Sequence, residues 1–159
     1  MGFSTDAIHA GQQPDPTNGA VIPPIYQTST YEQEALGKPR QGYEYARTQN
    51  PTREALEKNV AALEQGTFGV AFSSGLGAIG SLLQSLQAGD HVLFTDNLYG
   101  GTYRLADQVW RKFGLQFSFV DTSQLANVKN GLQPNTRLVF LETPTNPVLT
   151  VSDICLLYT

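Results

Sequence analysis

Apolar residues follow two alternating patterns along this chain. Helical spacing predicts a helix that Asn50 or Thr52 caps and Gly66 ends, another that opens at Leu76, and two more over 103–113 and 123–129. Short apolar runs predict strands at 68–72, 91–95, 115–120 and 137–141. Because strands alternate with helices, the pattern indicates βαβ units with right-handed crossovers, and therefore an α/β fold with a mostly parallel sheet.

The first 50 residues lack both patterns. They show no sustained hydrophobic periodicity, and they contain five prolines: Pro14, Pro16, Pro23, Pro24 and Pro39. A segment of this kind cannot form a core of its own. We therefore expect residues 1–50 to form an extended arm that lies across a partner surface.

Composition and charge exclude several classes of protein. The 159 residues are 40% hydrophobic, which is typical of one globular domain, and the net charge of -4 argues against a nucleic-acid or anionic-membrane partner. Cys155 is the single cysteine, and two isolated histidines cannot build a metal site with it. No apolar run reaches membrane-spanning length. We expect a soluble cytoplasmic protein without a metal.

The stretch 68–80 contains the first candidate chemistry. A predicted strand runs into Ser73, Ser74 and Gly75, and a helix follows. This order directs free backbone N–H groups and the positive end of a helix dipole at one point, which suits a phosphate, although a plain strand-to-helix turn is the alternative. Polar loops also follow the strands at 91–95 and 137–141. Because all three loops follow carboxyl ends of parallel strands, we expect them to share one ligand crevice.

Two interpretations of the glycine turn are open from the residues alone. Gly75, Gly77 and Gly80 form G-x-G-x-x-G, and Asp96 lies about twenty residues further on, as in a dinucleotide site of a nicotinamide-dependent oxidoreductase. That interpretation gives no role to other polar residues of these loops. A phosphorylated aromatic cofactor does: the turn would bind its phosphate, Tyr99 would face its ring and Asn146 would bond a ring substituent. These parts suit pyridoxal phosphate (PLP).

Four separated motifs carry a family resemblance. The segments YEYARTQNPTREALE, FSSGLGAI, DNLYGGTYR and LVFLETPTNP resemble the cystathionine γ-synthase and γ-lyase family of PLP-dependent trans-sulfuration enzymes, and the match runs from about residue 3 to residue 154. The resemblance outweighs the dinucleotide fingerprint. It implies the large-domain sheet of PLP transferase fold type I, flanked by helices and preceded by an N-terminal arm.

The resemblance also implies roles for individual residues. Tyr45 and Arg47 would hold the cofactor phosphate of a neighbouring subunit, so the site would form in a dimer, and the family assembles as tetramers. Gly75 and Leu76 would give backbone N–H groups to the phosphate of their own subunit. Tyr99 would stack on the cofactor ring and take part in proton transfer.

Three further positions follow from the same resemblance. Arg104 would lie near the substrate, and Asn146 near the phenolic oxygen of the cofactor. Glu142 is expected to be a structural hydrogen-bonding residue rather than a catalytic acid. The expected activity is γ-replacement or γ-elimination on a homoserine-derived substrate or cystathionine. Synthase and lyase are not separated, and a non-catalytic interaction module is a further alternative.

The family's Schiff-base lysine, its aspartate beside the pyridine nitrogen and its substrate arginine would all follow residue 154. We therefore expect an N-terminal fragment of a longer enzyme, inactive as it stands. Residues 1–50 would be the arm, 51–154 the first part of the cofactor-binding domain, and 155–159 a non-native tail, because the family pattern is lost after Ile154.

Overall fold

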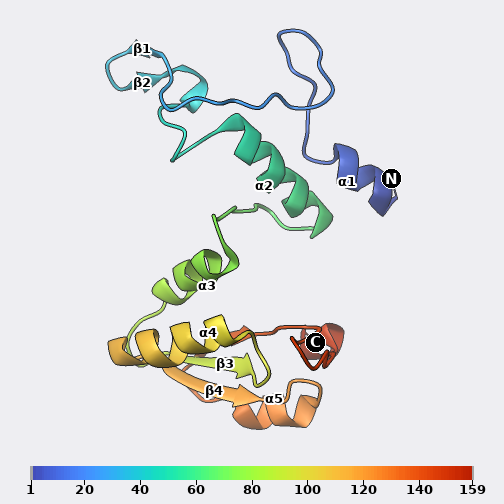
Figure 1. The fold of residues 1–159 in the computed structure, drawn as a ribbon, viewed down its shortest axis with the longest axis vertical. Helices are drawn as coiled ribbons and strands as arrows, with labels where there is room; N and C mark the ends of the chain where they lie inside the picture. The colour runs from blue at the N-terminus through green and yellow to red at the C-terminus, as the bar shows by residue number, and fades with distance from the viewer. Residues whose placement is uncertain (1, 159) are drawn as a thin grey trace. The chain divides into compact units, whose positions relative to one another are not determined.

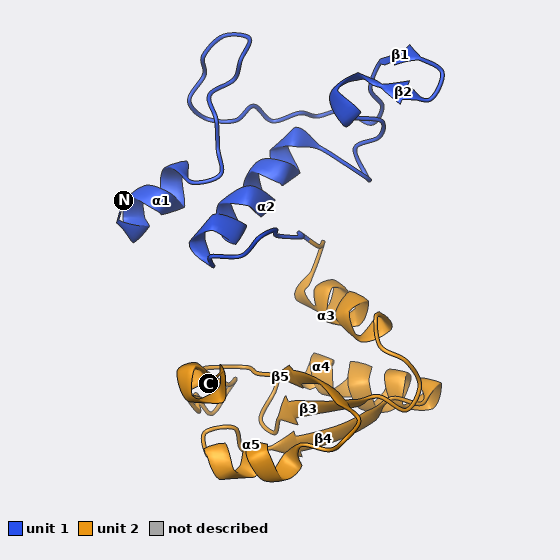
Figure 2. Ribbon diagram, turned by 180° about the vertical axis from the view of Figure 1, so that it is seen from behind, with its two compact units in different colours: residues 1–71 blue, residues 72–159 orange. Residues whose placement is uncertain are grey.

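The computed structural model describes residues 2–158 (Figure 1). The chain forms two compact units, Met1–Ala71 and Phe72–Thr159, which are coloured separately in Figure 2. Each unit has its own elements and hydrogen bonds. The predicted arm boundary at residue 50 concerns subunit assembly and stays a prediction.

The longest helix of the first unit is α2, Pro51–Leu63, as predicted. The Asn50 side chain accepts a hydrogen bond from the Thr52 N–H at 2.9 Å, and Pro51 occupies the first turn, where its missing N–H costs nothing. At the other end, the Gly66 N–H donates to the Ala61 carbonyl at 2.7 Å. The local sequence thus determines both ends of this helix.

Residues before α2 contain structure that hydrophobic periodicity did not predict. These elements are α1 (Phe3–His9), the antiparallel pair β1 (Gln33–Ala35) and β2 (Lys38–Pro39), and a 3-10 turn at Arg40–Gly42. The Asn59 side chain donates to the carbonyls of Asp6 and Ala10 at 3.2 and 2.8 Å. A side chain at Gly11 (φ 70) would come within 2.5 Å of the Lys58 carbonyl carbon. Contacts with α2, rather than periodicity, therefore order this segment.

The second unit is built on a parallel three-stranded sheet with the order β4–β3–β5, which confirms the predicted α/β class. Its strands are β3 (His91–Thr95), β4 (Gln116–Val120) and β5 (Thr136–Phe140). All five residues of β3 are buried. A central strand buried on both faces reads as a continuous apolar run, which is why the sequence showed no alternation there.

Helices cover both faces of this sheet (Figure 2). Val92 and Phe94 share a core with Leu83 of α3 and Ala106. On the other face, α5 packs so closely that a side chain at Gly131 would lie 2.8 Å from Leu93 Cδ1. The helices are α3 (Gly75–Gln84), α4 (Gly100–Arg104), which continues as π-helical Leu105–Val109 and 3-10 Trp110–Phe113, α5 (Leu125–Gly131) and α6 (Ile154–Tyr158).

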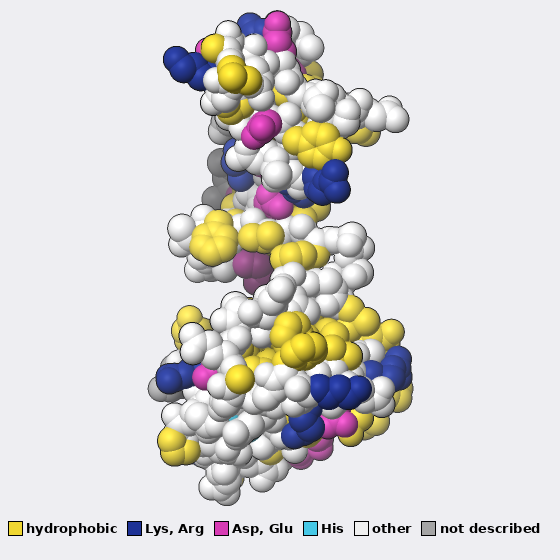
Figure 3. Space-filling view, turned by 90° about the vertical axis from the view of Figure 1, so that its left-hand side faces the viewer, with side chains coloured by type: hydrophobic (Ala, Val, Ile, Leu, Met, Phe, Trp, Pro, Cys, Tyr) yellow, Lys and Arg dark blue, Asp and Glu magenta, His cyan; other side chains and the backbone are white. Residues whose placement is uncertain are grey.

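The predicted strand at 68–72 is wrong for this structure, because no β ladder forms there. The Ala71 N–H donates to the Glu57 side chain at 2.9 Å instead of to a neighbouring strand. Phe68, Val70 and Phe72 are 79%, 62% and 46% exposed. An apolar run of this composition favours an extended backbone, but a β-strand also needs a second strand to pair with. Figure 3 shows that such hydrophobic side chains lie at the surface in both units.

Two helix boundaries also differ from the predictions. The helix expected over 103–113 begins at Gly100, and the one expected from 123 begins at Leu125. In the second case, Asp121 accepts hydrogen bonds from the Ser123 N–H at 2.9 Å and hydroxyl at 2.6 Å, which stabilises a turn before the helix. None of the described helices is long and apolar enough to cross a membrane.

Candidate functional site

The N-terminus of α3 offers backbone donors to an anion. Ser74 is the N-cap, and its side chain accepts a hydrogen bond from the Gly77 N–H at 3.0 Å. Gly75 and Leu76 are the first two helical residues, so their N–H groups have no acceptor within the helix. No atom lies within 4 Å of the place a side chain would take at Gly75. A phosphate oxygen could approach this backbone, where the helix dipole favours negative charge.

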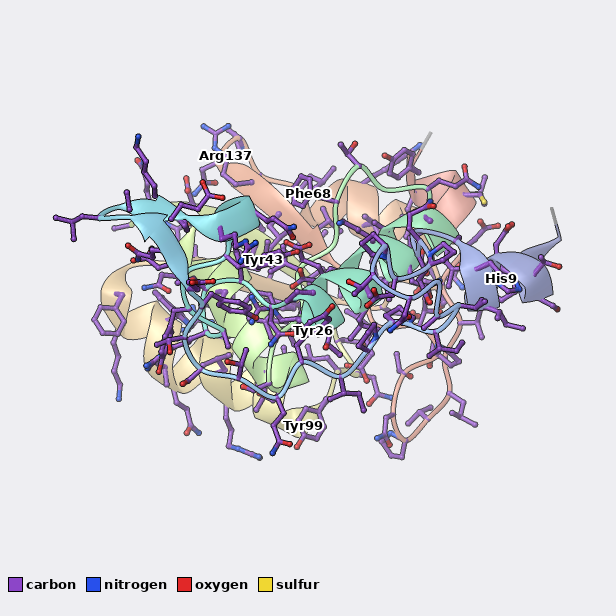
Figure 4. The ribbon with its side chains drawn as sticks, turned by 90° about the horizontal axis from the view of Figure 1, so that it is seen from above. His9, Tyr26, Tyr43, Phe68, Tyr99 and Arg137 are labelled. Carbon is purple, nitrogen blue, oxygen red and sulfur yellow. The ribbon has the colours of Figure 1, made fainter. Side chains whose placement is uncertain are left out.

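Tyr99 lies beside this helix end. It precedes α4, and its carbonyl accepts the Thr102 N–H at 2.9 Å. A side chain at Gly101 would overlap the Tyr99 ring and come within 3.1 Å of Leu76 Cδ1. The side chains of Tyr99 and Leu76, two predicted site residues, therefore both approach Gly101. The Tyr99 side chain is 52% exposed, so its ring is accessible (Figure 4).

Glu142 joins the loop after β3 to the loop after β5. Its Oε2 accepts the Tyr99 N–H at 2.8 Å, and its Oε1 accepts the Asn146 N–H at 3.3 Å. Its own N–H donates to Thr95 Oγ1 at 3.2 Å. Both carboxylate oxygens are thus engaged by the backbone, which agrees with the structural role expected for Glu142. The two loops meet at the carboxyl edge of the sheet, as predicted, whereas the third loop of that prediction, at Ser73–Gly75, follows no strand.

A chain of buried hydroxyl groups supports this edge. Thr122 Oγ1 lies 3.0 Å from Thr95 Oγ1 and 2.6 Å from Ser152 Oγ, and the Ser152 N–H donates to Thr143 Oγ1 at 3.0 Å. Thr95, Thr122 and Ser152 are all buried. Sequence analysis missed these residues, because isolated threonines and serines at strand and loop ends carry no spacing signal.

Arg104 and Asn146 are exposed residues of the same unit. Arg104 ends α4, and its Nη1 lies 3.4 Å from the place a side chain would take at Gly100. The loop that holds Asn146 contains two cis peptide bonds, Thr143–Pro144 and Asn146–Pro147. The backbone of Asn146 is tied to Glu142, and its side chain is exposed at the surface.

The other two predicted phosphate ligands lie in the first unit. Arg47 Nη2 donates to the Tyr45 hydroxyl at 3.2 Å, and the guanidinium carbon lies 5.1 Å from the centroid of the Tyr45 ring. Arg53 of α2 donates to the Ala46 carbonyl at 3.1 Å, and Glu57, four residues further along α2, accepts the Ala71 N–H at 2.9 Å. Their spacing of four residues on a helix is a signal that sequence analysis could have used.

The structure does not supply the context of a dinucleotide fingerprint. That motif needs a strand directly before the glycines, and residues 68–72 form none. Its third glycine normally permits close helix packing, yet a side chain at Gly80 would lie an ordinary 3.8 Å from Leu105 Cδ2. Among the residues that the structure describes, no three His, Cys, Asp or Glu side chains gather as a metal site.

Comparison with known proteins gives consistent matches. The family described as "Cys/Met metabolism PLP-dependent enzyme" matches residues 4–158. A probable cystathionine gamma-synthase of Herpetosiphon aurantiacus is 54% identical over 153 residues, 96% of this chain and 48% of the relative. A cystathionine beta-lyase of Lactococcus lactis subsp. cremoris is 51% identical over 152 residues, 96% of this chain and 40% of the relative.

The structure is also similar to a solved one. The cystathionine gamma-lyase of Lactobacillus plantarum, solved in complex with L-serine, matches with a TM-score of 0.91 and 46% identity over 99% of this chain and 41% of that one. The chain therefore spans less than half the length of these relatives.

Proposed function

This chain belongs to the Cys/Met metabolism PLP-dependent enzyme family, and from that premise we propose that it supplies part of the active site of a trans-sulfuration enzyme. The proposed reaction is γ-replacement or γ-elimination on a homoserine-derived amino acid or on cystathionine. The observation that carries the proposal is the meeting of the α3 N-terminus with Tyr99 at Gly101, which sets an anion site beside an exposed aromatic ring.

These residues fit the cofactor chemically. The N–H groups of Gly75 and Leu76 suit a phosphate, and the exposed Tyr99 ring suits a planar heterocycle. The side-chain amide of Asn146 can donate to a phenolic oxygen. When bound, the cofactor supplies an electron sink that lets the carbons of the amino acid lose protons.

Three side chains of this chain have proposed roles in proton transfer, positioning and substrate binding. Tyr99 is the proposed catalytic residue, because its hydroxyl can hold and return a proton beside the ring. Glu142 positions Tyr99, since both of its oxygens already accept backbone N–H groups. Arg104 carries a positive charge at the end of α4, the helix that Tyr99 precedes, and would attract the carboxylate of an amino-acid substrate.

Tyr45 and Arg47 are proposed to complete the phosphate site of a neighbouring subunit. Their contact through the Tyr45 hydroxyl places two hydrogen-bonding side chains together in one turn, with Tyr45 half-buried and Arg47 exposed. A guanidinium suits phosphate because its N–H groups are planar and permanently charged. The proposed assembly is a homodimer that pairs into a tetramer.

Ligand titration tests the cofactor. We expect the full-length protein to bind PLP and not NAD, in calorimetric titrations with each. Leu76→Pro removes one N–H donor and should weaken PLP binding, whereas Leu76→Met keeps the donor and should not. NAD binding that Asp96→Ala abolishes would contradict the proposal.

The products made from cystathionine then separate the reactions. Cleavage at the γ-carbon releases cysteine, and cleavage at the β-carbon releases homocysteine. Because the relatives include a γ-synthase, a γ-lyase and a β-lyase, this measurement decides between chemistry at the γ-carbon and at the β-carbon. Homocysteine as the main product would overturn the proposed γ-chemistry while leaving PLP dependence intact.

A further inference from the structure

The turn that carries Tyr45 and Arg47 is fixed to the segment before it. The Ala46 N–H donates to the Ser29 carbonyl at 2.8 Å, and an isolated β-bridge joins Tyr45 to Thr30. Within the turn, the N–H groups of Thr48 and Gln49 both donate to the Tyr45 carbonyl at 3.0 Å. The carbonyls of residues 46–48 are left to find donors elsewhere.

Arg53, in the first turns of α2, supplies those donors. Its Nη1 donates to the carbonyls of Ala46 and Arg47 at 3.1 and 3.3 Å, and its Nη2 donates to the Thr48 carbonyl at 2.6 Å. One rigid guanidinium thus binds three consecutive carbonyls, which a lysine ammonium could not match in the same geometry. The backbone on both sides of Arg47 is tied to α2.

Glu57 holds Arg53 in turn. Its Oε1 lies 3.4 Å from Arg53 Nε, and the same carboxylate oxygen accepts the Ala71 N–H at 2.9 Å. The two side chains are 31% and 18% exposed, so solvent screens this pair less than it would a fully exposed one. All three guanidinium nitrogens of Arg53 are therefore engaged within the unit.

We propose that Arg53 and Glu57 are a positioning pair that sets the geometry of the Tyr45–Arg47 phosphate clamp. Arg53 does not bind the phosphate itself, because its nitrogens bond carbonyls and a carboxylate. It acts through Arg47 by fixing the backbone from which that side chain extends. The inference rests on the proposed function, in which Arg47 binds a cofactor phosphate.

A double-mutant cycle on the full-length protein tests this inference. Dissociation constants for PLP and for pyridoxal, which lacks the phosphate, are measured for Arg47→Ala, Arg53→Ala and the double variant. Arg47→Ala should weaken PLP binding about ten- to hundredfold, as expected for loss of a charged hydrogen bond. Arg53→Ala should lose much of the same factor, and the double variant should lose no more than Arg47→Ala alone.

Pyridoxal gives the readout that a merely structural role would not produce. Because pyridoxal has no phosphate, its affinity should change in none of these variants. Arg53→Lys keeps the charge and the helix propensity but loses the planar set of guanidinium donors, so it should also weaken PLP binding. It replaces Arg53→Ala in the experiment if that variant does not fold. Glu57→Gln removes the charge partner and should give a smaller loss. Arg40→Ala is the matched control, since Arg40 forms an exposed ion pair with Glu32 in the same unit.

The outcomes separate this inference from the proposed function. Unchanged PLP affinity in Arg47→Ala overturns both the phosphate role of Arg47 and the positioning role of Arg53. A loss in Arg47→Ala with full affinity in Arg53→Lys overturns the positioning role alone. Additive losses in the double variant, or a parallel loss for pyridoxal, also overturn it, because they show that Arg53 acts on the fold in general.

Discussion

His91 is the first residue of β3 and lies buried in the second unit. Its Nδ1 is 2.8 Å from Thr136 Oγ1, and its Nε2 is 3.0 Å from Ser118 Oγ. Both ring nitrogens therefore have hydroxyl partners, which can act as donor or acceptor. Burial lowers the pKa of His91 below its ordinary value of 6.5, because a charged imidazole would lose its hydration there.

This pKa shift predicts acid sensitivity. Below about pH 6.5 the unfolded chain takes up a proton at this histidine that the folded chain does not, so the free energy of unfolding falls as the pH decreases. In denaturant titrations, the free energy of unfolding should fall less between pH 7.5 and pH 5.0 in His91→Asn than in the native sequence. His9→Asn, on the exposed helix α1, removes an imidazole without opening a buried site. An equal fall with and without His91 would contradict this account.

At the scale of elements, one carboxylate and three hydroxyls align the loops at the carboxyl edge of the sheet. Glu142 receives N–H groups from two loops, and the chain Thr95–Thr122–Ser152 links the ends of β3 and β4 to residue 152. Because Thr95, Thr122 and Ser152 are buried, loss of a hydroxyl partner among them leaves an unsatisfied donor or acceptor, whereas Glu142 is half-buried. The edge should therefore respond to substitutions that preserve size and change only hydrogen bonding.

Glu142→Gln gives the sharpest test at this edge. Glutamine keeps the shape but replaces one acceptor oxygen by an NH₂ group, which would face a backbone N–H. We expect the free energy of unfolding to fall by about 0.5–1.5 kcal/mol, because both hydrogen bonds are exposed and water can replace the lost acceptor. The free energy of unfolding should also fall in Thr95→Val. It should fall less in Thr95→Ser, which keeps the hydroxyl. Glu64→Gln, at an exposed position, is the control. Native stability in Glu142→Gln would show that Tyr99 and Asn146 do not depend on this carboxylate.

At the scale of the whole molecule, the residues proposed to contact the cofactor divide between the two compact units. Tyr45 and Arg47 belong to the first, and Gly75, Leu76 and Tyr99 belong to the second. If Arg47 acts on a neighbouring subunit, one mutated subunit can be repaired by another. Mixing full-length Arg47→Ala subunits with full-length Tyr99→Ala subunits should then regenerate one intact site in each heterodimer, and PLP retention and turnover should both return.

The reciprocal mixture distinguishes the two arrangements. Subunits that carry both substitutions, mixed with native subunits, should give heterodimers without an intact site, because the native Tyr99 would face the altered residue 47. If Arg47 instead acts within its own subunit, the first mixture gives no recovery and the second gives heterodimers with one intact site. That pair of results would overturn the proposed dimer-built site.

The sequence alone determined the helices with clear end signals, the parallel sheet and the family. Asn50, Pro51 and Gly66 delimit α2 through their own backbone chemistry, and a helix dipole follows Gly75 whatever packs around it. The apolar runs at β3, β4 and β5 predicted a parallel α/β sheet, which the structure confirms. The four quoted motifs identified PLP dependence and fold type I, and the matches to related enzymes agree.

Tertiary structure decided the local conformations and side-chain roles that depend on residues distant in the sequence. Residues 68–72 have a strand-like composition but form no ladder, since Glu57 takes the Ala71 N–H. The segment before α2 gains its order from side chains such as Asn59, which lies about fifty residues from its acceptors. The spacing of Arg53 and Glu57 indicates an ion pair on one helix, but no pattern shows what Arg53 and Glu142 bind, because each bonds backbone groups, which every residue carries. Only three-dimensional proximity selects which carbonyl or N–H a side chain meets.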